Sequence, residues 1–235
     1  MKRRALVTGG SGAIGAAICR RLAADGFDVV VHANSRLEAA QQVAASIGAR
    51  AVAFDVTDAD ATRAALDALI EDEPIQVIVN NAGIHDDATF AGMGRGQWQG
   101  VIDVSLNGFF NVTQPLVLPM IRTRWGRIVS ITSIAAEIGN RGQVNYAAAK
   151  GALHSASRSL AREIGSRGVT VNCVSPGLIE TPMSAGAFDA QFVERMIPLQ
   201  RMGTPEDVAG VVAVLASDAA GYITGQVVPV NGGMA

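Results

Sequence analysis

Short apolar segments alternate with amphipathic segments along the whole chain. The apolar segments are rich in valine, isoleucine and leucine, whereas the amphipathic segments repeat their apolar residues with helical spacing. Strands are almost continuously apolar when helices cover both faces of a parallel sheet. The pattern therefore predicts an α/β protein with a doubly wound parallel sheet. The seven predicted strands are Arg4–Thr8, Asp28–Ala33, Arg50–Phe54, Ile75–Asn80, Arg127–Thr132, Val169–Val174 and Val227–Val230.

Helices are predicted between these strands, and one of them is expected to be bent. Residues 97–121 have helical spacing, but Pro115 removes a hydrogen bond inside that helix, and the bend is expected there. The predicted helices are Ala13–Ala24, Arg36–Ile47, 58–71, 97–121, Gln143–Ser166 and Pro205–Ala216.

The 235 residues are predicted to form a single domain, residues 1–235, because no repeat or linker interrupts the alternation. Hydrophobic residues make up 49% of the chain and charged residues 17%, which suffices for a large core. The net charge of −2 gives no basic field for nucleic acid. The basic start, Met1–Arg4, precedes an apolar run too short for a signal peptide or a membrane span. We expect neither a nucleic-acid partner nor a membrane.

Neither the cysteines nor the acidic residues predict a metal site. Cys19 and Cys173 lie in apolar surroundings without ligand spacing, so we expect inert thiols in a reduced, cytoplasmic protein. His85, Asp86 and Asp87 have the spacing of loop residues, and no further ligands accompany them.

Tyr146 and Lys150 stand four residues apart with only alanines between them, so they share one face of a helix. A neighbouring ammonium favours phenolate, and we expect Lys150 to lower the pKa of Tyr146. Ser133 follows a buried strand, which puts its hydroxyl at that strand's carboxyl end. A tyrosine and a solvated lysine that share a helix by chance are the alternative. This group is a candidate acid/base site.

A glycine-rich turn, Thr8–Gly15, joins the first strand to the first helix. Such a turn lets backbone N–H groups approach a pyrophosphate at the helix N-terminus, although it also serves plain strand–helix packing. The second strand ends in Asn34, Ser35 and Arg36 and lacks the carboxylate that binds the ribose 2′-hydroxyl of NAD. Amide, hydroxyl and guanidinium donors favour a 2′-phosphate, hence NADPH, although Asn34 and Ser35 could instead cap the next helix.

Polar residues follow the third and fourth strands as well. Asp55 and Val56 are placed to hold the adenine, although Asp55 could also cap a helix. Asn81, Ala82 and Gly83 form a small turn suited to the ribose and nicotinamide. Because open α/β sheets bind ligands at the carboxyl ends of their strands, these residues are expected to converge.

Several motifs occur together. They are Thr8–Gly15, Asn80–Gly83, Ser133, Tyr146 with Lys150, Pro176 with Gly177, and the stretches Gly139–Lys150, Ser159–Glu163, Ile179–Thr181, Tyr222–Gly225 and Val230–Met234. Through them essentially the whole chain resembles the short-chain dehydrogenases/reductases, with a Rossmann-type fold. Within that family it is most similar to the bacterial 3-oxoacyl-(acyl-carrier-protein) reductases. Related acetoacetyl-CoA and other ketone reductases share much of this sequence.

The resemblance implies reduction of a 3-keto group by NADPH. Tyr146 would donate the proton, Ser133 would hold the carbonyl oxygen, and Lys150 would bind the nicotinamide ribose. Ile179 and Thr181 would contact the carboxamide. The residues expected at the cofactor are Gly9, Ser11, Gly12, Ile14, Gly15, Asn34, Ser35, Arg36, Asp55, Val56, Asn81, Ala82, Gly83, Tyr146, Lys150, Pro176, Gly177, Ile179 and Thr181.

The chain departs from the family pattern at two places. Ala13 replaces the middle glycine, which is tolerable if Gly12 takes the positive-φ role, and Gly12 stands where NADP-dependent relatives often have arginine. Ser105 replaces the asparagine that holds a water of the proton relay to the lysine. Asn107 lies about 200° further round the helix and cannot take over without a change of register. An impaired or rearranged relay is expected.

The resemblance also implies partners. Basic residues matching Arg124 and Arg167 dock the acyl carrier protein in the resembled reductases, although cations also pair with helix C-termini. A homotetramer is expected, with the two long helices at one interface and Val227–Met234 at another. Its apolar contacts would include Phe109, Phe110, Leu116, Leu153 and Leu160.

Two other functions remain open. One is reduction of another ketone, such as acetoacetyl-CoA or a polyketide- or aryl-polyene-type chain, which a lid over 184–197 would select. The other is NADP binding with weak turnover.

Overall fold

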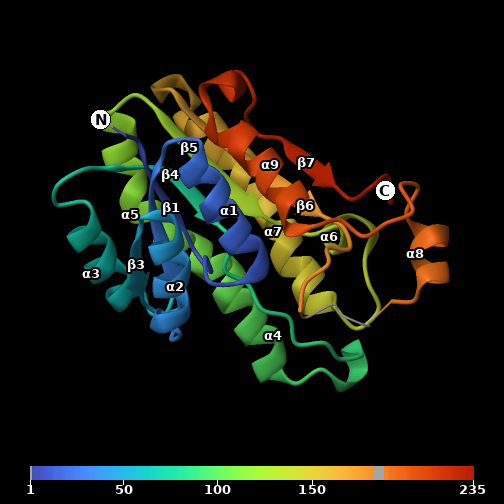
Figure 1. The fold of residues 1–235 in the computed structure, drawn as a ribbon. Coiled ribbons are helices and arrows are strands. Elements are labelled where there is room, and N and C mark those ends of the chain that lie inside the picture. The colour runs from blue at the N-terminus through green and yellow to red at the C-terminus, as the bar shows by residue number, and fades with distance from the viewer. Residues whose placement is uncertain (1, 183–187) are drawn as a thin grey trace.

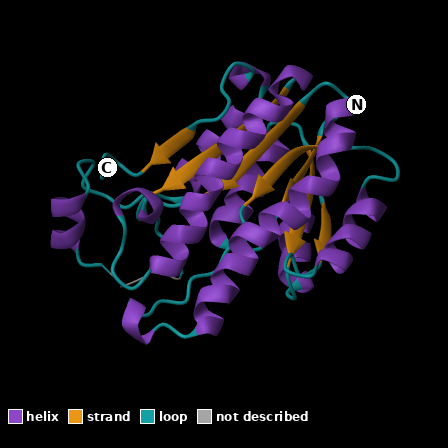
Figure 2. Cartoon of the chain, turned by 180° about the vertical axis from the view of Figure 1, so that it is seen from behind, coloured by secondary structure: helices purple, strands orange, loops and turns teal. Residues whose placement is uncertain are grey.

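Seven parallel strands form one sheet in the order β3-β2-β1-β4-β5-β6-β7 in the computed structural model, which describes residues 2–182 and 188–235. The order reverses between β1 and β4, which leaves a crevice at the carboxyl ends of these neighbouring strands. Figure 2 shows the arrowheads of the strands pointing to one end of the molecule. The strands are β1 (Arg4–Val7), β2 (Asp28–Ala33), β3 (Arg50–Ala53), β4 (Ile75–Asn80), β5 (Gly126–Ile131), β6 (Val169–Pro176) and β7 (Val227–Val230).

Helices cover both faces of this sheet, as the continuously apolar strands predicted. On one face α1 (Ala13–Ala24), α2 (Leu37–Ile47) and α9 (Pro205–Ala216) enclose one apolar core (Figure 1). The other face packs against α3 (Ala59–Leu69), α5 (Gly108–Arg122) and α7 (Val144–Ile164) around a second core. The doubly wound Rossmann-type fold is confirmed, and most predicted boundaries lie within two residues of those observed.

Three short helices were not predicted as separate elements. They are α4 (Arg95–Ile102), α6 (Ala135–Ile138) and α8 (Ala190–Met196). The α6 helix follows β5 almost directly, and α8 lies beside the C-terminus (Figure 1). The expected lid, 184–197, begins outside the described residues, and its later part forms α8 and the residue after it.

The helical run expected over 97–121 is present, but it is not a single α-helix with its irregularity at Pro115. The irregularity is a π-helical turn at Asp103–Asn107, between α4 and α5, whereas α5 continues through Pro115. At the π-helical turn the chain lies close to the loop after β3, because a Cβ on Gly108 would be 2.9 Å from Val56 Cγ2. The π-turn places its extra residue where this contact is made.

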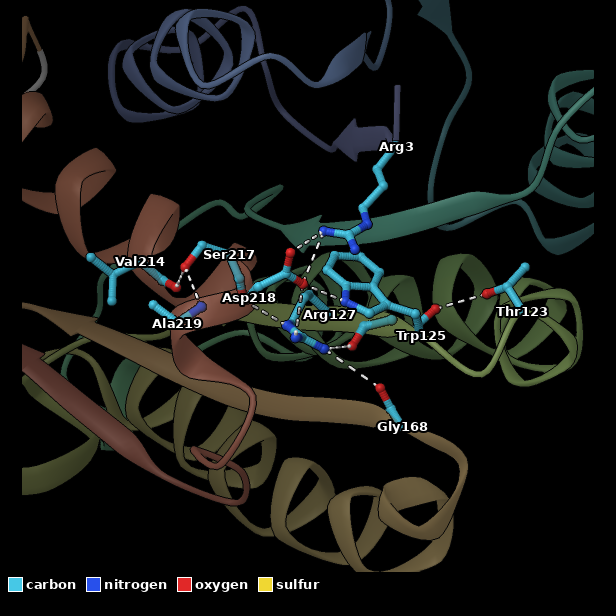
Figure 3. A network of polar contacts seen from close by, with 10 residues as sticks. Arg3, Thr123, Trp125, Arg127, Gly168, Val214, Ser217, Asp218 and Ala219 are labelled. Atoms are coloured by element: carbon cyan, nitrogen blue, oxygen red, sulfur yellow. Dashed lines mark hydrogen bonds and ion pairs between the residues drawn. The ribbon is translucent and has the colours of Figure 1, made fainter. Parts of the chain in front are cut away.

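A polar network fastens the amino ends of β1 and β5 to the residues after α9 (Figure 3). The carboxylate of Asp218 accepts from Arg3 Nη1 at 2.9 Å and from Trp125 Nε1 at 2.8 Å. The guanidinium carbon of Arg3 lies 3.7 Å from the centre of the Trp125 ring, and that of Arg127 lies 4.3 Å from it. Arg127 is buried and donates to the Ser217 carbonyl at 3.0 Å. The apolar pattern of β5 gave no sign of this buried arginine.

Both cysteines are buried free thiols. Burial raises the pKa of Cys19 to about 12 and also raises that of Cys173, so both thiols stay protonated at neutral pH. Within residues 2–182 and 188–235, none of the helices is both long enough and apolar enough to cross a bilayer.

Candidate active site

The structure brings Ser133, Tyr146 and Lys150 together at the carboxyl end of β5. Tyr146 and Lys150 lie one turn apart on α7, and Lys150 Nζ is 5.6 Å from the centre of the Tyr146 ring. Ser133 lies just beyond β5, near enough to Tyr146 for its hydroxyl to lower the pKa of the phenol. The Ala135 amide donates to Ser133 Oγ at 3.2 Å. Because Ser133 accepts this bond, its own O–H is available to donate to another group.

The protonation of this group differs from the expectation that Lys150 lowers the pKa of Tyr146. Burial raises the pKa of Tyr146 above its ordinary value of 10.0, and the hydrogen bond from Ser133 opposes this only in part, while Asp87 adds to the rise. Burial also lowers the pKa of Lys150 to about 8, because the ammonium loses its water. Desolvation is therefore the largest influence on both groups, and Tyr146 is held as a phenol.

The start of α7 is fixed by polar side chains for which no role was predicted. Asn145 is buried and donates to the backbone carbonyls of Asp86, at 2.9 Å, and Gln97, at 3.1 Å. Its own oxygen accepts from the Tyr146 amide at 2.8 Å. Gln143 donates to Asp87 at 2.9 Å. The loop with the two aspartates therefore positions the Tyr146 helix, and no group of three metal-ligating side chains occurs within the described residues.

The glycine-rich turn is held against the turn after β4 by Thr8. The Thr8 hydroxyl accepts from the amides of Asn81 and Ala82, both at 3.0 Å, and the Asn81 side chain donates to the Thr8 carbonyl at 2.9 Å. His32 adds a contact from β2: its Nδ1 accepts from the Gly9 amide at 3.1 Å, so Nε2 donates to Phe54 at 2.8 Å. Burial lowers the pKa of His32 to about 4, so the ring is neutral at pH 7. Neither role was predicted.

The turn itself fits a dinucleotide. Gly9, not Gly12, takes the positive-φ role, with φ of +63°, whereas Gly12 has φ of −79° and precedes the first residue of α1. Ala13 is that first helical residue, where a methyl group is tolerated. A Cβ on Gly15 would collide with the Gly9 carbonyl, so only glycine permits this close approach. Ser11 and Ile14 lie beside Gly12 at the N-terminus of α1, where backbone amides can bind a phosphate.

The other expected cofactor residues lie at the same end of the sheet. Asn34, Ser35 and Arg36 are exposed directly after β2. Their side chains do not cap the next helix, because the N-cap residue of α2 is Arg36 and the helix has no side-chain cap. Asp55 accepts from the Thr57 amide at 2.9 Å, and the cap of α3 is another aspartate, so the alternative role for Asp55 as a helix cap is wrong.

Further expected contacts follow β4 and β6. A Cβ on Gly83 would be 3.1 Å from Lys150 Nζ, which places the Ala82–Gly83 turn against the ammonium. Gly177, after Pro176 at the end of β6, donates from its amide to the Val230 carbonyl at 2.9 Å. Ile179 is buried and pairs with Gly203 in a short parallel bridge, and Thr181 is half-buried.

Ser105 lies in the π-helical turn and is buried. Its hydroxyl has no hydrogen-bond partner among the described residues, and it borders a pocket of about 10 Å³ that Thr8, Asn80 and Leu153 also line. The turn changes the helical register, yet Asn107 points away and donates to Asp103 at 2.6 Å. Lys150 Nζ donates to the Ile131 carbonyl at 2.9 Å. Ser105 therefore faces the interior, and Asn107 does not take its place.

Arg124 and Arg167 lie side by side but far from Tyr146. Gly168, next to Arg167, packs so closely on the Arg124 carbonyl that a Cβ there would collide with it. Both arginines are exposed at the amino ends of β5 and β6. The 21 residues of α7 span about 30 Å between this end and the site.

Comparison with known proteins agrees with this geometry. Residues 9–235 match the family model described as enoyl-(acyl carrier protein) reductase. The chain is 44% identical over 241 residues to 3-oxoacyl-(acyl-carrier-protein) reductase FabG of Aggregatibacter actinomycetemcomitans, covering 100% of both chains. It is 44% identical over 238 residues to nodulation protein G of Rhizobium meliloti, covering 99% of this chain and 97% of the relative. It is 42% identical over 243 residues to acetoacetyl-CoA reductase of Allochromatium vinosum, covering 100% and 99%.

The site and these matches define a nicotinamide-dependent oxidoreductase with a Rossmann-type sheet. The chain belongs to the short-chain dehydrogenase/reductase family. The resemblance recognised from its motifs is thereby confirmed.

Proposed function

We propose that this protein uses NADPH to reduce 3-oxoacyl thioesters to 3-hydroxyacyl thioesters, with carrier-protein-bound chains of fatty-acid or related acyl-chain synthesis as substrates. The observation that carries the proposal is the meeting of Ser133, Tyr146 and Lys150 beside the glycine-rich turn. The full-length relatives named as 3-oxoacyl reductases support the substrate class.

The protein's part in the reaction is to orient the ketone and to supply a proton, while the bound cofactor supplies the hydride. The hydroxyls of Ser133 and Tyr146 hold the substrate oxygen between them. Because burial keeps Tyr146 protonated, it is ready to donate to that oxygen. Lys150, with a pKa of about 8, gains and loses protons near neutral pH and can reprotonate the phenolate that Tyr146 becomes on donating. We propose that Ser105 holds a water on this proton path.

The surroundings of Tyr146 suit an acyl chain. Large apolar side chains are exposed on the segments that border it: Ile84 is 46% exposed, Ile138 54% and Val144 42%. Phe188 and Met196, which flank or end α8, are also exposed. An extended alkyl or polyene chain would cover such side chains, whereas a small polar ketone would leave them in water.

The end of β2 supports NADPH over NADH. Asn34, Ser35 and Arg36 are exposed there without helix-capping duties, and no carboxylate stands among them. A charge-assisted contact to a 2′-phosphate contributes about 1.5–3 kcal/mol, or about ten- to a hundredfold in affinity. We expect kcat/KM to favour NADPH by that factor and Arg36→Ala to remove most of the preference. Equal kcat/KM values for the two cofactors in the unmodified enzyme would refute the proposed preference for NADPH.

The proposal is tested by measuring NADPH oxidation with acetoacetyl-CoA and with an acetoacetyl carrier protein. A higher kcat/KM for the carrier-bound substrate supports the proposal. A preference for the CoA thioester would favour the acetoacetyl-CoA reductase alternative, for which a 42% identical relative is known. Turnover of only polyketide- or aryl-polyene-type chains would indicate another ketone reductase. Tight NADPH binding without turnover of any of these substrates would indicate the weak-turnover alternative.

The proposed assembly is a cytoplasmic homotetramer that docks the carrier on Arg124 and Arg167. Because these arginines lie about 30 Å along α7 from Tyr146 of the same protomer, the docked carrier would serve a neighbouring protomer.

The set of apolar residues expected at the tetramer interface changes. Leu116 and Leu153 are buried within the protomer, whereas Phe110 is 60% exposed and remains a candidate. Phe109 and Leu160 pack partly on the protomer's own core.

A further inference from the structure

The buried face of α7 carries a row of polar side chains. Lys150, His154 and Ser157 are all buried on this face, each about one turn from the next. Each bonds to the sheet: Lys150 to the Ile131 carbonyl, His154 to the Thr132 hydroxyl at 2.9 Å, and Ser157 to the Cys173 thiol at 3.2 Å. Burying polar groups costs free energy unless they are hydrogen-bonded, and an apolar stripe would pack this helix equally well. The row therefore calls for an explanation beyond stability.

His154 reaches the residue directly before Ser133. The Thr132 hydroxyl donates to the Val174 carbonyl at 3.1 Å, so His154 Nε2 donates to the Thr132 oxygen. The pKa of His154 is lowered by burial, which agrees with a neutral ring in this donor role. The backbone of Thr132 also donates to Val174, at 2.8 Å. Hydrogen bonds to β6 and to α7, the helix that carries Tyr146, therefore both hold Thr132 in place.

We propose that His154 is a positioning residue that acts through Thr132 to hold the Ser133 hydroxyl against Tyr146. The inference rests on the proposed role of Ser133 in holding the substrate oxygen. The bond joins α7 to the end of β5, so it fixes the separation between the two elements that carry Tyr146 and Ser133. Without it, Ser133 would still be present but would meet the substrate oxygen less often in the reactive geometry.

The test is a set of variants assayed for kcat, for KM of NADPH and for melting temperature. Thr132→Val keeps the shape of the side chain and removes the hydroxyl, and His154→Leu removes the other partner. We expect each to lower kcat about ten- to a hundredfold with KM for NADPH changed less than about twofold. Thr132→Ser, which keeps the hydroxyl, should retain kcat within about twofold of the unmodified enzyme.

Repeating Thr132→Val and His154→Leu in a Ser133→Ala background distinguishes a positioning role of His154 from a merely structural one. If His154 acts through Ser133, neither change lowers kcat further there. Ser157→Ala is the matched control, because it removes a buried bond from the same face one turn further from Tyr146. It should leave kcat unchanged whatever it does to the melting temperature.

Two results would overturn the inference: kcat values for Thr132→Val and His154→Leu close to that of the unmodified enzyme, or losses that persist in full in the Ser133→Ala background. A Ser133→Ala enzyme as fast as the unmodified one would instead refute the proposed function of Ser133 itself. Because Thr132→Val nearly preserves volume, it provides a folded variant if His154→Leu does not fold.

Discussion

Replacing Lys150 by methionine is expected to stabilise the protein while abolishing its activity. The ammonium of Lys150 is almost completely buried, and burial lowers its pKa from 10.5 to about 8. At about 1.4 kcal/mol per pH unit, this difference in pKa lowers the free energy of unfolding by about 3 kcal/mol at neutral pH. The lost bond to the Ile131 carbonyl, worth about 1–3 kcal/mol, offsets part of it. A net gain of about 0–2 kcal/mol would raise Tm by up to about 8 °C.

The pH dependence of this effect has a definite sign. Since the folded pKa of Lys150 is lower than the unfolded one, the unfolded chain binds more protons between about pH 8 and 10.5, and the unmodified protein gains stability as pH rises. Lys150→Met lacks this gain, so its advantage should be full below pH 8 and shrink above it. The buried thiols and Tyr146 are common to both proteins, and only Cys173 differs between them, because Lys150 is the smallest of the influences that lower its pKa.

The assay is thermal and urea unfolding of both proteins at one fixed protein concentration, from pH 7 to 10. Lys2→Met is the control, since Lys2 is the chain's other lysine and is exposed, and changes at such sites stay within about 0.5 kcal/mol. A Lys150→Met protein that melts below the unmodified one at pH 7, or an advantage that does not shrink with pH, would contradict the reasoning.

Three further outcomes are expected. Tyr146→Phe should abolish NADPH oxidation yet leave NADPH binding, followed by fluorescence, nearly intact, and an active enzyme would refute the mechanism. Ser105→Asn, which adds an amide able to hold the relay water, should raise kcat with little change in KM; a lower kcat would mean that the pocket of about 10 Å³ is too small and that Ser105 is itself adapted. Light scattering should show a tetramer at micromolar concentration, and Phe110→Asp should dissociate it into smaller species.

Much of the fold could be predicted because strand and helix periods are local properties of the sequence. Alternating strands and helices with right-handed crossovers also indicate a parallel sheet covered on both faces, whereas the order of its strands was not predicted. The π-helical turn was missed because it depends on Gly108 meeting Val56, a contact between residues far apart in the chain. The burial of Arg127 was missed for the same reason, because the Ser217 carbonyl that accepts its hydrogen bond lies 90 residues away in the chain.

The candidate site was predicted in its residue types but not in its protonation. Spacing alone brought Tyr146 and Lys150 together, whereas the pKa values depend on how deeply the fold buries them. The motif likewise located Gly9 and Gly12 but assigned the positive φ to the wrong one. The contacts of Thr8, His32 and Asn145 were not predicted, because these side chains bind backbone groups of other loops, which no local pattern reveals.

The bond between Arg3 and Asp218 has a consequence for synthesis of the chain. It joins residues 215 positions apart, so it forms only after nearly the entire polypeptide has left the ribosome. Until then Trp125 lacks this partner for its indole N–H, although the two strands that pair with β1, β2 and β4, have already been made. A chain that stops before Asp218 would leave Arg127 buried without its nearest carboxylate, and such fragments should be recognised by proteases.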